Sequence, residues 1–269
     1  MNVRLAIVGT LVFSAVGLPA AVAAKAGIEW STAIPDALAR AADQGKPVLV
    51  DVWAVWCAPC KELEETTYRD AEVVRLAAEH VVPLKVDADV HETFLDRHRV
   101  DAFPTVLFLD GRGNEIARRE GLVSAPDMVE LLRALGQGYS GYVASRSKDG
   151  DADAMRSAAG FLRSVGNPEG AVELLRRGLK SVKGAEAEVV QGVELALAEA
   201  RLDAGEDKAA VKAFEALAAD GASSSIRDAA LAGLVRAERA RGRTDEASQA
   251  LARLRESSPQ RAGELENER

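Results

Sequence analysis

The order of apolar and polar positions divides the chain beyond residue 24 into two parts of different type. The first part, residues 25–136, alternates short apolar runs with stretches of helical spacing, as in domains that cover a sheet with helices. We expect strands at residues 48–53, 81–86, 105–109 and 114–119, and helices at residues 33–44, 61–65, 71–79, 91–99 and 126–135. The first two strands are nearly continuous in apolar residues, which is typical of strands buried on both faces. The pattern therefore predicts a mixed α/β domain.

The second part, residues 151–256, contains almost no strand pattern and repeats one motif three times. A glycine, a short charged turn and an amphipathic stretch recur at Gly166, Gly205 and Gly242, which are 39 and 37 residues apart. In each unit an alanine stands five residues after the glycine and an apolar residue stands nine after it. The motif is typical of the turn inside a helix pair, and three such pairs predict a short solenoid. A plain helical bundle is the alternative.

Two further segments flank the repeats. Residues 137–150 combine glycine with serine and charged residues, which predicts a linker between the two parts. Residues 257–269 are mostly polar and predict a frayed C-terminal tail.

The N-terminal segment, residues 1–24, has the pattern of a secretory signal. Arg4 precedes twenty uncharged residues that end in Val22-Ala23-Ala24, a small-x-small cleavage site. An uncleaved membrane anchor is the alternative, since twenty residues can just span a bilayer. Gly9, Gly17 and Pro19 weaken that alternative. We therefore expect a periplasmic protein.

Composition narrows the functional classes. The chain is 48% hydrophobic and 28% charged, as is ordinary for a soluble globular protein. Its formal net charge of −8 argues against general nucleic-acid binding, which needs a basic surface. The three histidines are expected at the surface or at helix ends, and neither a metal nor a cofactor is expected. Because Cys57 and Cys60 are the only cysteines, a four-cysteine zinc site within the chain is excluded.

The Cys57-Ala58-Pro59-Cys60 motif stands where a strand passes into a helix. The thiolate is the nucleophile in disulfide exchange, and a helix N-terminus stabilises it. Cys57 is therefore the expected attacking thiol, and Cys60, one turn on and deeper, the resolving thiol. Pro59 fits early in the helix, where its missing N–H costs little. A static disulfide is the alternative, but a four-residue loop constrains little unfolded-state entropy.

Asp51 is a carboxylate inside an otherwise apolar strand. A buried unpaired charge is costly, so we expect its pKa to be raised. Lys85, in the next strand along the chain, is its expected partner. The alternative is that both side chains stand at strand ends and reach solvent.

The segment 48–61, which contains Trp53-Ala54-Val55-Trp56-Cys57, resembles the active-site segment of thioredoxins. Residues 83–87 and 100–105 follow in the order and spacing of that family, so the resemblance covers residues 28–136 and implies a thioredoxin-like fold. Residues 66–73 resemble the C-terminal reductase domain of the bacterial transmembrane thiol–disulfide interchange protein. Ala58 departs from the glycine of typical thioredoxins, which leaves the redox potential open. The second part resembles degenerate tetratricopeptide repeats.

The resemblance also implies roles for individual residues. Asp51, with Lys85 beside it, would accept the proton of Cys60 during resolution. Pro104 would follow a cis peptide bond and offer backbone groups to an extended substrate. Trp56, Pro59, Phe103 and Pro104 would form the substrate-binding surface. Trp56 would be either an exposed platform for the partner protein or a packed lid, and we favour the platform. Trp30 and Trp53 are expected to be packing residues.

These features predict an extracytoplasmic thiol–disulfide oxidoreductase, with a reductase favoured by the subgroup resemblance. Its expected partners are protein disulfide or thiol clients, an upstream thiol donor such as a membrane electron-transfer protein, and a protein bound in the repeat groove. The direction of exchange depends on the redox potential and on that donor. The alternative function is a holdase-like chaperone or an assembly factor that binds through the repeats.

Overall fold

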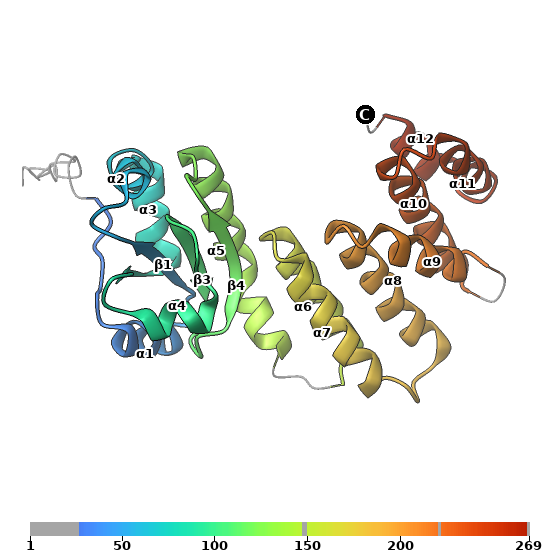
Figure 1. The fold of residues 1–269 in the computed structure, drawn as a ribbon. Helices are drawn as coiled ribbons and strands as arrows, with labels where there is room; N and C mark the ends of the chain where they lie inside the picture. Colours follow the sequence, from blue (N-terminus) through green and yellow to red (C-terminus); the bar gives the residue numbers. More distant parts are fainter. Residues whose placement is uncertain (1–26, 147–149, 220–221, 268–269) are drawn as a thin grey trace, which may run out of the picture.

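The computed structural model describes residues 27–146, 150–219 and 222–267. The predicted signal segment therefore lies outside the described residues. An α/β domain stands at one end of the molecule, and a curved row of helix pairs extends from it to the C-terminus (Figure 1). Within the part of the chain that the structure describes, no helix is both long and apolar enough to cross a membrane.

The α/β domain is built on one four-stranded sheet in the order β2-β1-β3-β4. The strands are β1 (Val48–Trp53), β2 (Val82–Asp87), β3 (Thr105–Leu109) and β4 (Glu115–Glu120). β1 runs parallel to β2 and antiparallel to β3, and β3 and β4 form the expected hairpin. The strands agree with the sequence prediction to within about a residue, because short apolar runs are readable from the chain. β1 is buried on both faces as expected. β2 stands at the sheet edge and alternates buried with half-buried positions, so the expectation of burial on both faces is wrong for that strand.

Helices cover both faces of this sheet. The apolar cluster on one face joins α1 (Ile34–Gln44) and α4 (Glu92–His98) to β1 through Val48, Val50 and Val52. The cluster on the other face joins Leu49 of β1 to the remaining helices of the domain, α2 (Ala58–Glu65), η1 (Thr67–Arg69), α3 (Ala71–His80) and α5 (Ala125–Arg146). Since successive strand side chains point to opposite faces, Asp51 shares the second face with Leu49.

Three helix pairs follow, as the glycine motif predicted. They are α6 (Ala152–Ser164) with α7 (Pro168–Ser181), α8 (Ala187–Asp203) with α9 (Asp207–Leu217), and α10 (Ser224–Ala240) with α11 (Thr244–Ser257). The turns contain Gly166, Gly205 and Gly242, whose φ values of 77°, 73° and 71° favour glycine. α8 packs against both α6 and α10, so the pairs stack in a row. This stacked arrangement is consistent with helical repeats.

The segment expected to be a linker is largely helical. α5 continues through Gly136, Gly138 and Gly141 to Arg146, so the prediction of a linker at 137–150 is wrong for residues 137–146. The glycines are explained by packing: an added Cβ would come within 2.7 Å of His80 at Gly136 and within 2.4 Å of Phe161 at Gly138. A single apolar cluster therefore runs from the sheet through α5 into α6, α7 and α8.

Side chains also join the first helix pair to the edge strand β4. The amide of Asn167 donates to the Ile116 carbonyl at 2.7 Å, and Nη2 of Arg119 donates to the Val165 carbonyl at 3.2 Å. The Oδ1 atom of Asn167 also accepts the Gly170 N–H and so caps α7. The turn between α6 and α7 is thus fastened to the sheet edge.

The C-terminal segment is not frayed over its described length. Residues Pro259–Asn267 form α12, which buries Ala262 and Leu265 in the apolar cluster of the last repeat. The prediction of a frayed tail is therefore wrong for these residues, because Ala262 and Leu265 pack α12 onto the last helices of the stack.

Candidate active site

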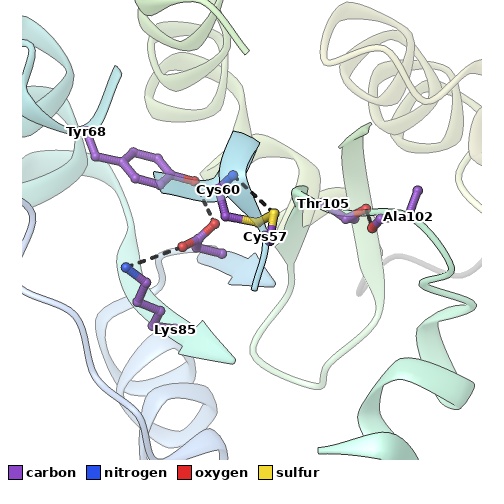
Figure 2. The surroundings of a disulfide bond; sticks show 7 residues. Cys57, Cys60, Tyr68, Lys85, Ala102 and Thr105 are labelled. Atoms are coloured by element: carbon purple, nitrogen blue, oxygen red, sulfur yellow. Dashed lines mark hydrogen bonds and ion pairs between the residues drawn. A yellow bond between two sulfur atoms is a disulfide. The ribbon is translucent and has the colours of Figure 1, made fainter. Parts of the chain in front are cut away.

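Cys57 and Cys60 form a disulfide at the N-terminus of α2 (Figure 2). Cys57 is the N-cap residue, and its Sγ accepts the backbone N–H of Cys60 at 3.1 Å. Helix N-termini leave such N–H groups without backbone partners, and they favour negative charge nearby. Pro59 is the second residue of the helix, where the missing N–H leaves no gap. The sulfur of Cys57 therefore lies where a thiolate would be stabilised.

The two cysteines do not differ in depth. Cys57 is 4% exposed and Cys60 is 5% exposed, so the expectation that Cys60 lies deeper is wrong for this disulfide form. The backbone hydrogen bond to the Cys57 sulfur is what distinguishes them.

Asp51 lies on β1 and is 2% exposed. Its register partner on β2 is Lys85, whose Nζ lies 3.7 Å from Oδ2 of Asp51. Burial raises the pKa of Asp51 to about 6, against the opposing effect of the Lys85 charge. The alternative in which Asp51 reaches solvent at a strand end is therefore wrong, and the predicted pairing with Lys85 is present.

Lys85 makes three further contacts. Its ammonium binds the carboxylate of Glu64 on α2. It also lies over the rings of Trp53 and Trp30, at 5.1 Å and 5.7 Å from their centroids. Both tryptophans are half-buried and act as packing residues, as expected. These contacts hold the Lys85 charge beside Asp51, and the Lys85 side chain is 20% exposed.

Sequence reasoning missed Tyr68, on η1. Its hydroxyl donates to Oδ1 of Asp51 at 3.3 Å (Figure 2), and its side chain is buried. Trp30 meets the Tyr68 ring edge-on at 4.9 Å between centroids. The sequence shows only that one large aromatic residue stands in the polar segment 66–70. Without a periodic pattern in this segment, its contact with Asp51 cannot be predicted.

The loop before β3 lies on the other side of the disulfide in Figure 2. The Phe103–Pro104 peptide bond is cis, as the resemblance implied. The Thr105 hydroxyl donates to the Ala102 carbonyl at 2.8 Å, and the Gly121 N–H donates to the Pro104 carbonyl at 2.8 Å. These bonds hold the proline loop against the start of β3 and the end of β4.

Trp56 is 62% exposed and is not a packed lid. Its Nε1 donates to Oδ1 of Asp89 at 3.1 Å, and its ring meets Phe103 edge-on at 5.5 Å. The side chain is therefore held in place beside Cys57 while most of its surface stays open.

The segments that form this site carry exposed apolar side chains. Across the described ranges, six large apolar residues are exposed, and four of them belong to segments that carry or contact site residues: Val55, Trp56, Val90 and Leu122. Val90 follows Asp89, the partner of Trp56, and Leu122 follows Gly121, the partner of Pro104. We call these four residues the apolar rim. Clustered exposed apolar side chains mark interaction surfaces.

A metal site is not formed by the residues that the structure describes, since no group of three or more His, Cys, Asp or Glu side chains is placed to hold an ion. The three histidines lie at helix ends: His80 is the last residue of α3, His91 is the N-cap of α4, and His98 is the last residue of α4. His98 is buried and stacks against Phe94, and burial lowers its pKa.

Known proteins that resemble this chain match it in the α/β domain. Residues 34–136 match the family model of the thioredoxin-like domain. The thiol:disulfide interchange protein DsbD of Yersinia pestis (strain Pestoides F) is 41% identical over 98 residues, which cover 34% of this chain and 16% of that protein. DsbD of Escherichia coli (strain K12) is 39% identical over 95 residues, which cover 34% and 17%. The match thus spans under a fifth of the length of these relatives.

Among solved structures, a thioredoxin from Thermus thermophilus is 25% identical and aligns with a TM-score of 0.40 over 44% of this chain and 94% of that one. Homology to disulfide interchange proteins and the Cys57–Cys60 pair together support a protein-disulfide oxidoreductase, and residues 34–136 of this chain are a thioredoxin-like domain.

Proposed function

We propose that this protein is an extracytoplasmic thiol–disulfide oxidoreductase that reduces disulfides in protein clients through Cys57 and Cys60. The observation that carries the proposal is the sulfur of Cys57 at the N-terminus of α2, where it accepts the Cys60 N–H. The exposed Trp56 directly precedes Cys57. A thiolate there is stabilised for attack, and the rim offers a surface on which a polypeptide can dock.

The first step is attack of the Cys57 thiolate on one sulfur of the client disulfide. A bond forms between Cys57 and that sulfur, the client S–S bond breaks, and the second client sulfur leaves as a thiolate that takes a proton from solvent. In the second step the Cys60 thiol loses its proton to Asp51, and its sulfur attacks the Cys57 sulfur. The bond between Cys57 and the client sulfur breaks, and that client sulfur leaves as a thiolate that takes a proton from solvent. The client leaves with both sulfurs reduced, and this chain is left with the Cys57–Cys60 disulfide.

Return to the dithiol form requires two electrons and two protons from an upstream dithiol donor. We propose a membrane electron-transfer protein as that donor, in keeping with the homology to thiol:disulfide interchange proteins. A donor can use the same open face as the client, because both reactions pass through Cys57. The acceptor role of Asp51 serves both directions, since a buried carboxyl with a pKa near 6 can take up or release a proton near neutral pH.

Trp56, Pro59, Phe103 and Pro104 would contact the client. Val55, Val90 and Leu122 of the apolar rim would extend that surface. Trp56 and Phe103 support one another, and Pro59 is exposed on the first turn of α2. Apolar contacts of this kind are tolerant of sequence, which suits an enzyme that meets many clients.

The helical repeats would recruit a partner protein. A cavity of about 560 Å³ between α6 and α8 is lined by Arg156, Gly160, Arg163, Leu195 and Glu199, among others. Concave surfaces of stacked helix pairs are suited to binding extended segments. A holdase or assembly-factor role is the second candidate, and this cavity is the observation that favours it. We also propose that the three helix pairs are degenerate tetratricopeptide repeats.

The periplasm is the proposed location, supported by the signal pattern at residues 1–24. Fractionation of the native host, followed by N-terminal sequencing of the exported protein, should find a chain that begins at Ala24 or Lys25. A chain that begins at Met1 and dissolves only in detergent would support the anchor instead.

The activity is tested by insulin reduction with the full chain and a chemical thiol donor. The native protein should accelerate reduction, Cys57→Ser should abolish the acceleration, and Cys60→Ser should accumulate covalent complexes with insulin. Val90→Ser should raise KM for insulin but not for a small disulfide, whereas Val143→Ser, an exposed valine of α5 away from the rim, should change neither. If the native protein does not accelerate insulin reduction, the proposed function is wrong.

A further inference from the structure

Among the described residues, Tyr68 is the only one whose hydroxyl donates a hydrogen bond to Asp51. The hydroxyl donates to Oδ1, while Lys85 lies nearer Oδ2, so the two groups hold the two carboxylate oxygens separately. They reach Asp51 from different elements, η1 and β2. A carboxylate bound at both oxygens has a defined orientation, which a proton acceptor for a neighbouring thiol needs.

The position of the Tyr68 hydroxyl is set by packing rather than by solvent. The side chain is 1% exposed, and Trp30 meets its ring edge-on. The preceding residue, Thr67, is fixed by a hydrogen bond of 2.6 Å from its hydroxyl to the Val123 carbonyl. Burial and the neighbouring Asp51 raise the pKa of Tyr68 well above its ordinary value, so the group stays protonated and acts only as a donor near neutral pH.

We propose that Tyr68 is a positioning residue for the resolving step, and that its hydroxyl holds the Asp51 carboxylate in the ionised form that accepts the proton of Cys60. The inference rests on the proposed disulfide exchange, to which it adds one residue. A donor that binds the ionised form of an acid favours that form. Tyr68 thereby works against the burial that would keep Asp51 protonated and unable to accept a proton.

Within the described ranges, three polar or charged groups face Asp51, and the effect of each on its ionisation can be tested by substitution. Lys85 faces it from β2, Tyr68 from η1, and Glu64 from α2, which also carries Cys57 and Cys60. Lys85 and Tyr68 favour the ionised carboxyl, and Glu64 opposes it. In the disulfide form neither cysteine titrates, so Asp51 can be followed without interference from the thiols.

Tyr68→Phe tests the proposal, because it removes one oxygen atom and keeps the ring against Trp30. The pKa of Asp51 is measured in the full-length disulfide form by ¹³C NMR of its carboxyl carbon. We expect Tyr68→Phe to raise it by about one pH unit, the size of one hydrogen bond. The matched control is Tyr139→Phe, which removes the hydroxyl of another buried tyrosine, on α5. It should leave the Asp51 titration unchanged.

A kinetic measurement gives a second readout. The acid limb of the pH profile for release of a preformed mixed disulfide should move upward in Tyr68→Phe by the same amount, while alkylation of Cys57 keeps its rate. An Asp51 pKa equal in Tyr68→Phe and the native protein overturns the proposal. If the native protein fails to reduce insulin, the proposed function falls, but the NMR titration still decides whether Tyr68 controls Asp51.

Discussion

Gly138 on α5 lies so close to Phe161 on α6 that an added Cβ would stand 2.4 Å from Cδ2 of the ring. The absence of a side chain lets the first repeat helix pack directly on the last helix of the thioredoxin-like domain. Phe161 also stacks against Tyr142 of α5 at 5.0 Å between centroids. A glycine in a helix interior is unfavourable, so its presence here reflects this close packing rather than a flexible segment.

Gly138→Ala should therefore destabilise the protein by about 1 kcal/mol or more, since overpacking exceeds the gain in helix propensity. Gly141→Ala is the matched control on the same helix, because nothing lies within 4 Å of its Cβ position. It should stabilise the protein by up to about 1 kcal/mol. Denaturant unfolding of both variants measures the difference. Equal effects would show that α5 and α6 do not pack in this way.

Asp51→Asn should raise the free energy of unfolding at pH 7. The carboxyl has a pKa of about 6 in the folded state against an ordinary value of 3.8, so between about pH 4 and 6 the folded protein holds a proton that the unfolded chain has lost. Stability therefore falls as pH rises through that window, by up to about 3 kcal/mol, and Asn removes the loss.

Urea unfolding at pH 4 and pH 7 checks this sign. Asp51→Asn and the native protein should differ at pH 7 and approach each other near pH 4. A difference of the same size at both pH values would show that ionisation of Asp51 is not its source.

Asp51→Asn should also slow the release of a mixed disulfide while leaving alkylation of Cys57 largely unchanged near neutral pH. The carboxylate is expected to matter when Cys60 must lose a proton, and the Cys57 sulfur is stabilised by the Cys60 N–H instead. Stopped-flow release of a labelled peptide measures the first rate and iodoacetamide labelling the second. Asp43→Asn, an exposed site on α1 across the sheet, is the control. Equal slowing of both steps would refute the assignment.

In the reduced protein, iodoacetamide at pH 6–7 should label Cys57 about tenfold faster than Cys60, or more. Exposure is not the reason, because the two side chains are equally buried in the disulfide form. The preference should come from the N-cap position of Cys57 and the N–H that its sulfur accepts. Mass spectrometry of the digested protein reads both rates. Faster labelling of Cys60 would reverse the proposed roles.

Several features of the site can be predicted from the amino-acid sequence. Asp51 and Lys85 stand in apolar strands, and their partnership follows once the two strands are parallel neighbours. The placement of Cys57 at a helix N-terminus follows from a strand that meets a proline-containing helix start. The cis bond before Pro104 is predicted only through the family resemblance, because no local pattern marks it.

The sequence by itself determined the elements, the three glycine turns of the repeats and the motif that carries the chemistry, because local periodicity and turn residues are properties of neighbouring positions. Only the tertiary structure decided that Tyr68 reaches Asp51, that the two cysteines are equally buried, and that residues 137–146 continue a helix. Each of these depends on contacts between segments far apart in the chain. A glycine that admits a ring from another helix has the same local signature as a glycine in a linker, and packing alone distinguishes them.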